Sequence, residues 1–156
     1  MAKRVSVNST TGETPQGFAK HAQEFFCAAD LVLAKAESVS LPAYFLLGRS
    51  IELSLKAFLL HQGVSISVLS SKKLGHNLEV LLDKAKKYGV DQHVQLDTLE
   101  CGVVQLLSFD YAEKRLEYRN TGGTYYLPLL DVTWDIARKL AYEIDTAWNQ
   151  PVGRNN

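Results

Sequence analysis

Cysteine is scarce in this 156-residue chain: it occurs twice, at Cys27 and Cys101, with no CxxC pair. Two isolated cysteines argue against a disulfide framework or a zinc site and fit buried thiols in a reducing compartment. We therefore expect both to be small core residues. Histidine offers no metal site either, because no histidine has a second His, Cys or carboxylate at a repeated helical spacing. The sequence predicts no metal and no cofactor. The four histidines are His21, His61, His76 and His93.

Neither sign of charge is in excess, since 17 Lys and Arg residues balance 17 Asp and Glu residues. The neutral total removes the global positive field that many nucleic-acid-binding proteins show, although a local basic patch is compatible with it. Charge alone therefore leaves nucleic acid open as a partner.

Long apolar runs are missing as well. The opening "MAKRVSVNSTTGET" has two basic residues but no signal-peptide core, and no stretch is long enough to span a membrane. We expect a cytoplasmic protein without membrane contact. The polar ends predict flexible tails at 1–13 and 150–156, around one domain at 14–149 whose 46% hydrophobic content can supply a core.

The usual catalytic strings are also absent, among them GxxxxGK[ST], GxGxxG, HExxH and GxSxG. Most enzyme classes are therefore disfavoured. What the sequence does contain is helical periodicity along most of its length. Five segments are predicted to be helical: 15–37, 41–62, 78–88, 92–118 and 128–148.

Capping residues support these boundaries. Thr14, Ser40, Asn77 and Asp91 each precede a periodic segment as an N-cap, and Gly63 is a natural stop for the second one. The stretch 64–74 is predicted to be a loop, since no second alternating run exists to pair with it as a strand.

The fourth segment is expected to turn Leu96, Leu99, Val103 and Leu106 toward the core and to break at an undetermined point within "FDYAEKRLEYRN". With no convincing strand, the leading fold is all-α, an antiparallel helical bundle of four to five helices.

The second segment is apolar almost all round, and Phe45 and Trp134 add candidate exposed apolar side chains. This surplus of apolar surface predicts a homodimer. The alternative is a large monomeric core in which the helix is fully central.

Three charged residues of this helix, Arg49, Glu52 and Lys56, share one side because they lie three and four residues apart. We expect a partly enclosed polar seam in which Glu52 pairs with Arg49 or Lys56 and His76 reaches in from the next helix. The alternative is an ordinary solvent-exposed stripe, with His76 serving only to cap or pack its helix.

A second candidate lies in "LEYRNTGGTYYLP", where Tyr118, Tyr125 and Tyr126 surround Arg119 and a glycine pair. Arginine among aromatic rings can stack bases or bind phosphate, so this stretch is predicted to be a mobile loop beside a binding surface. Alternatively, the tyrosines only pack the loop onto the bundle.

The motif "GRSIELSLKAFLLHQG", followed after a loop by "LGHNLEVLLDKA", resembles the HEPN family of small all-α domains. The later "EYRN" and "YYLP" resemble the Arg/Tyr segment that often precedes the last HEPN helix, so the similarity covers about residues 15–148. The resemblance implies a dimeric helical module that binds a nucleotide, RNA or a partner protein, such as a nucleotidyltransferase or a toxin–antitoxin partner.

Active HEPN ribonucleases resemble one another in an Arg followed by a His within about two helical turns. This chain departs from that pattern, because Arg49 lies twelve residues before His61 and no histidine follows Arg115 or Arg119. The ribonuclease assignment therefore does not carry over, and no catalytic residue is assigned.

Three functions stay open on this basis. The first is a non-catalytic HEPN-like binding module, the second a divergent metal-independent endoribonuclease that uses His76 with Arg49 or Arg119, and the third a purely structural subunit. The candidate binding residues are Arg49, Glu52, Lys56, His76, Asn77, Tyr118 and Arg119.

Overall fold

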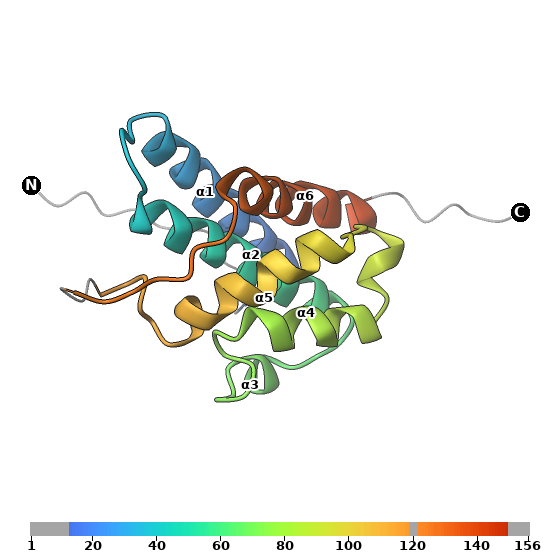
Figure 1. Cartoon of the computed structure of the whole chain (residues 1–156). Helices are drawn as coiled ribbons and strands as arrows, with labels where there is room; N and C mark the ends of the chain where they lie inside the picture. Colours follow the sequence, from blue (N-terminus) through green and yellow to red (C-terminus); the bar gives the residue numbers. More distant parts are fainter. Residues whose placement is uncertain (1–12, 119–121, 150–156) are drawn as a thin grey trace, which may run out of the picture.

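The structure, a computed structural model, describes residues 13–118 and 122–149 (Figure 1). These residues form six α-helices and one 3-10 helix and no strand, which confirms the predicted all-α helical bundle. The predicted tails lie outside the described residues, apart from residue 13. The elements are α1 (Pro15–Leu33), α2 (Leu41–His61), α3 (Ile66–Leu69), α4 (Leu78–Lys87), η1 (Val90–Gln92), α5 (Thr98–Ala112) and α6 (Leu130–Asn149).

Helix α2 is the centre of the bundle. It packs against α1 and α6 on one side and against α4 and α5 on the other (Figure 1). Fourteen of its 21 residues are buried, which explains why its apolar residues run nearly all round. Phe45 and Trp134 are half-buried against the same core. The apolar residues of α2, Phe45 and Trp134 are therefore covered within one chain, and they no longer support the predicted homodimer. The homodimer stays a prediction.

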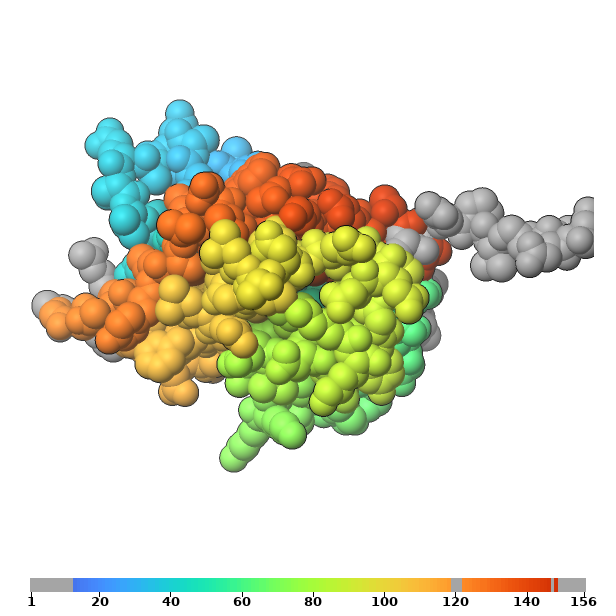
Figure 2. All heavy atoms as spheres, turned by 45° about the vertical axis from the view of Figure 1, so that its right-hand side comes forward, coloured from blue at the N-terminus to red at the C-terminus, as the bar shows by residue number. Residues whose placement is uncertain are grey.

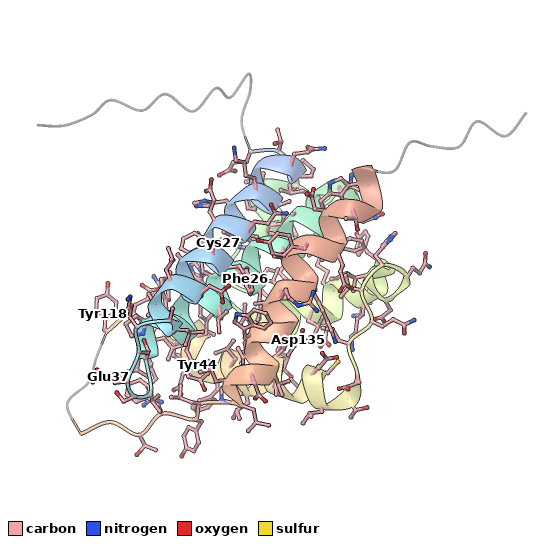
Figure 3. All side chains as sticks on the ribbon, turned by 90° about the horizontal axis from the view of Figure 1, so that it is seen from above. Phe26, Cys27, Glu37, Tyr44, Tyr118 and Asp135 are labelled. Atoms are coloured by element: carbon pink, nitrogen blue, oxygen red, sulfur yellow. The ribbon has the colours of Figure 1, made fainter. Side chains whose placement is uncertain are left out.

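Aromatic packing joins α1 to α6 across this core. The ring of Phe26 lies 5.2 Å from that of Trp134 and 5.8 Å from that of Tyr142, and Figure 3 shows Phe26 between the two helices. Trp134 Nε1 also donates a hydrogen bond to Asp30. These contacts fix α1, which forms one wall of the site described below.

Local capping signals set most helix starts as predicted. The side chains of Thr14, Ser40 and Asn77 each accept a hydrogen bond from the backbone N–H three residues further on. Gly63, with a φ of 87°, follows the end of α2 at His61. The segment 64–74, predicted as a loop, contains the single short helix α3.

The predicted start of the fourth helix is wrong. Asp91 lies in η1 rather than at an N-cap, and α5 begins at Thr98. The reason is a capping box: Asp97 accepts a hydrogen bond from the Glu100 N–H at 2.8 Å, while the Glu100 carboxylate accepts one from the Asp97 N–H at 2.9 Å.

The predicted inner face of this helix is confirmed at Val103, which is buried, and Leu96 packs against the core just before the helix begins, but the prediction is wrong at Leu99 and Leu106. Leu99 and Leu106 are 58% and 41% exposed. Helix α5, yellow in Figure 2, lies at the surface of the molecule in that view. Two carboxylates, Glu100 and Asp110, are buried instead, because each forms an ion pair with a cation on another segment. The apolar residues that α5 buries are Val103, Val104, Leu107 and Tyr111.

The cysteines do not both lie in the core. Cys27 is exposed on α1, which contradicts the expectation, and its thiol lies 3.5 Å from the Tyr142 hydroxyl. Cys101 is half-buried, with its sulfur 2.9 Å from the Lys86 ammonium. Neither forms a disulfide.

Candidate functional site

The centre of the candidate site is Glu52, a carboxylate that is fully buried on α2. One of its oxygens, Oε1, accepts hydrogen bonds from Arg49 at 2.9 Å and from Lys56 at 2.6 Å. The three- and four-residue spacings read from the sequence thus produce the predicted pairing, and Glu52 pairs with both cations at once.

The second oxygen of Glu52 has two partners from other helices. The Nδ1 of His76, just before α4, lies 3.1 Å from Oε2, and the hydroxyl of Tyr111 on α5 donates to the same oxygen at 2.5 Å. The predicted approach of His76 is confirmed. Tyr111 was missed by sequence reasoning, because it lies 59 residues away and no local pattern connects it to Glu52.

The electrostatics of the cluster keep Glu52 ionised. Burial by itself would raise the pKa of its carboxyl, but the charges of Lys56 and Arg49, with hydrogen bonds from Lys56 and Tyr111, bring that pKa below its ordinary value. Burial, reinforced by the negative charge of Glu52, raises the pKa of Tyr111, so the phenol keeps its proton and acts as a donor.

Arg49, Lys56 and His76 line a surface cavity of about 480 Å³. The ammonium of Lys56 is held there by a second acceptor, the Gly75 carbonyl, at 2.7 Å. Within this cluster two cations face one carboxylate, and the exposed Glu13 adds a second carboxylate to the lining of the cavity. The wall formed by Arg49 and Lys56 is therefore the part of the cavity that attracts an anion.

Another wall of the cavity comes from α1, where Phe18 and His21 line it at helical spacing. Phe25 follows one turn beyond His21 and does not line the cavity. The Phe25 ring is already occupied: the Arg49 guanidinium carbon lies 5.9 Å from its centre and the His21 ring 4.8 Å from it. Phe18 lines the cavity without a ring or cation packed on it from the described part of the chain. The site thus combines a cationic wall with one available aromatic side chain.

Two further predicted site residues, Asn77 and Tyr118, do not line this cavity. Asn77 caps α4, and its side-chain oxygen accepts a further hydrogen bond from Ser108 at 3.3 Å. Tyr118 is 68% exposed, and Figure 3 places it at the outer edge of the molecule in that view. Arg119 lies outside the described residues.

The described part of the predicted mobile loop is tied to α5. The buried carboxylate of Asp110 accepts hydrogen bonds from the Arg115 guanidinium at 2.6 Å and from the Tyr126 N–H at 2.7 Å. Arg115 in turn donates to the Thr124 carbonyl at 2.5 Å and lies over the Tyr125 ring. For residues 124–126 this agrees with the interpretation in which the loop packs onto the bundle.

Comparison with family models, with curated proteins and with solved structures found no match to this chain. Within the described residues, no helix is both long enough and apolar enough to cross a membrane. Membership of the HEPN family and a cytoplasmic location therefore stay predictions. The function proposed below is inferred from the geometry of the site.

Gly48 keeps Tyr111 in reach of Glu52, because a methyl group on its Cα would lie 2.6 Å from a carbon of the Tyr111 ring. We expect Gly48→Ala to lower the free energy of unfolding by about 1–3 kcal/mol through this overpacking, measured by urea denaturation. Gly102→Ala is the matched control, since its added methyl meets nothing within 4 Å on α5, and it should not destabilise. Equal stabilities for the two variants would contradict the packing argument.

Proposed function

We propose that the protein is a non-catalytic helical module that binds a phosphate-bearing ligand in the cavity beside α2. One observation carries the proposal: a fully buried glutamate holds Arg49, Lys56 and His76 along the cavity wall. A carboxylate in this position stabilises the three side chains before any ligand arrives, which lowers the entropy cost of binding.

The cations keep donors for a ligand. Lys56 has three N–H groups, of which Glu52 and Gly75 take two. Arg49 has five, of which Glu52 takes one and the Tyr111 hydroxyl oxygen interacts with another. Phosphate oxygens are the natural acceptors for such groups, since charge-assisted hydrogen bonds to phosphate are short and strong.

A nucleotide fits these features better than an RNA strand does. The cavity, at about 480 Å³, has the size of a small-molecule site. Single-stranded nucleic acid is usually bound by several aromatic rings that stack successive bases. Here Phe18 can serve one base, whereas Phe25 is covered by Arg49 and His21.

The HEPN resemblance supports this proposal, because it independently implies nucleotide or RNA binding. It also implies a dimer and a protein partner such as a nucleotidyltransferase. Both stay expectations from the resemblance, separate from the cavity argument.

Calorimetric titration with ATP and with a single-stranded RNA dodecamer tests the proposal. Arg49→Met should weaken ATP binding about tenfold or more, because a hydrogen bond between charged groups contributes about 1.5–3 kcal/mol. ATP recovered from the wild-type sample should be intact.

Arg138→Met is the matched control. Arg138 also pairs with a carboxylate three residues away, at 2.9 Å, but on α6. It should bind ATP as the wild type does. The proposal would be contradicted if the wild type did not bind ATP, or if both variants lost the same affinity for ATP. If the wild type bound the RNA dodecamer but not ATP, the ligand of the cavity would be RNA rather than a nucleotide.

A metal-independent endoribonuclease is the second candidate, favoured by one specific observation. Arg49 and His76, too far apart in sequence for the ribonuclease pattern, contact the same glutamate and line the same cavity. A histidine oriented by a carboxylate is suited to general base catalysis, and an arginine can stabilise charge on phosphate. Cleavage of labelled RNA that persists in chelator and is lost in His76→Ala would establish this activity in place of pure binding.

A further inference from the structure

The contact between His76 and Glu52 decides which nitrogen of the imidazole ring titrates. Glu52 is ionised, so its oxygens only accept hydrogen bonds, and the Nδ1 of His76 must carry a proton to donate across the 3.1 Å contact. In the neutral ring the proton is therefore on Nδ1 and Nε2 bears a lone pair. Any proton that His76 gains on acidification goes to Nε2.

This tautomer determines what His76 offers to an anion. The imidazole ring is 41% exposed and lines the cavity. With a lone pair on Nε2, the ring cannot donate to a phosphate oxygen from that atom. After protonation Nε2 becomes a donor, and the ring adds a positive charge.

Charged groups from each neighbouring element act on this step. The carboxylates favour the protonated ring and the two cations on α2 oppose it, while Tyr111, as a neutral donor, stays constant. An anion in the cavity adds a further negative charge and so shifts the balance toward protonation. The groups are Glu13 and His21 by α1, Arg49, Glu52 and Lys56 on α2, and Tyr111 on α5.

We propose that anion binding in this cavity is coupled to protonation of His76 at Nε2, so that the site binds an anion more tightly as the pH falls. This inference rests on the proposed function, because it names a regulation of the same site. Linkage requires the coupling to be reciprocal: the anion promotes protonation as much as protonation promotes anion binding.

Sulfate is a suitable probe, because it keeps two negative charges throughout the range in which histidine titrates. The affinity of the wild type for sulfate, measured by titration calorimetry, should rise about tenfold between about pH 8 and about pH 5.5. In His76→Gln, whose amide can still donate to Glu52 but does not titrate, the affinity should be the same at both pH values.

A second measurement does not depend on the variant folding. Wild-type titrations at about pH 6.5 in buffers of different ionisation enthalpy should show net proton uptake with each sulfate bound. His21→Gln removes the other histidine of the cavity and should retain the pH dependence. Sulfate binding that is independent of pH, or a dependence lost in His21→Gln and kept in His76→Gln, would overturn the inference while leaving the binding site intact. No sulfate binding at any pH would instead overturn the proposed function and the inference together.

Discussion

Glu52→Gln is expected to lower the free energy of unfolding by about 3–5 kcal/mol, the range for removing one partner of a buried ionic network. The wild-type carboxylate compensates Arg49 and Lys56 and accepts two further hydrogen bonds from His76 and Tyr111. A neutral amide leaves the two cations uncompensated, and its NH₂ group faces donors. Urea denaturation at neutral pH measures the loss.

The pH dependence of this difference provides an internal check. Because the pKa of Glu52 is lowered by folding, its contribution is complete above the ordinary value of 4.5 and is lost as the pH falls through the lower value of the folded state. The wild type and Glu52→Gln should therefore converge in acid. Glu24→Gln, which removes an exposed carboxylate paired with His21, should unfold like the wild type at neutral pH. A Glu52→Gln variant as stable as Glu24→Gln would contradict the buried network.

Asp110→Asn is expected to cost about 2–3 kcal/mol, since hydrogen bonds to a charged group contribute about 1.5–3 kcal/mol and this carboxylate is buried. It accepts hydrogen bonds from Arg115 and from the Tyr126 N–H, and through them it holds residues 124–126. Hydrogen exchange at the Tyr126 amide should therefore become faster in the variant, alongside a lower urea midpoint.

Asp135→Asn is the control for this change. Asp135 pairs with Arg138 and Lys139 on α6, and its carboxylate is far more exposed than that of Asp110. Exposed pairs contribute about 0–1 kcal/mol, and the Tyr126 amide should exchange as in the wild type. An unchanged exchange rate in Asp110→Asn would show that other contacts hold this segment.

Features that depend on a few neighbouring residues could be predicted from the sequence. The caps at Thr14, Ser40 and Asn77 need only a side chain and a backbone N–H three residues on. The pairing of Glu52 with Arg49 and Lys56 likewise follows from spacing along one helix.

Features that depend on how helices are rotated against one another could not be predicted. The rotation of α5 is set by the capping box at Asp97 and by buried ion pairs of Glu100 and Asp110. A pattern of apolar residues takes no account of those polar residues, so it predicted that Leu99 and Leu106 face the core, whereas both are exposed. For the same reason the sequence did not predict the contact of Tyr111 with Glu52, which its hydroxyl makes in the observed rotation of α5.

The burial of α2 illustrates a related limit. A helix that is apolar nearly all round is compatible with a dimer interface or with a central position in a monomer. Here α1, α4, α5 and α6 of the same chain cover it. The arrangement of those helices shows that α2 is covered within one chain, and composition does not contain that arrangement.

Whether the cavity beside α2 binds phosphate groups can be measured by a titration that resolves individual residues. In ¹H–¹⁵N spectra of the wild type, pyrophosphate should shift the backbone amides around the cavity, at Arg49, Gly75 and His76 and in the first turn of α1 at Gly17. The same titration of Arg49→Met should produce these shifts only at about tenfold higher pyrophosphate. Shifts confined to other surfaces, such as the exposed face of α5 around Leu106, or no shifts at all, would contradict the account.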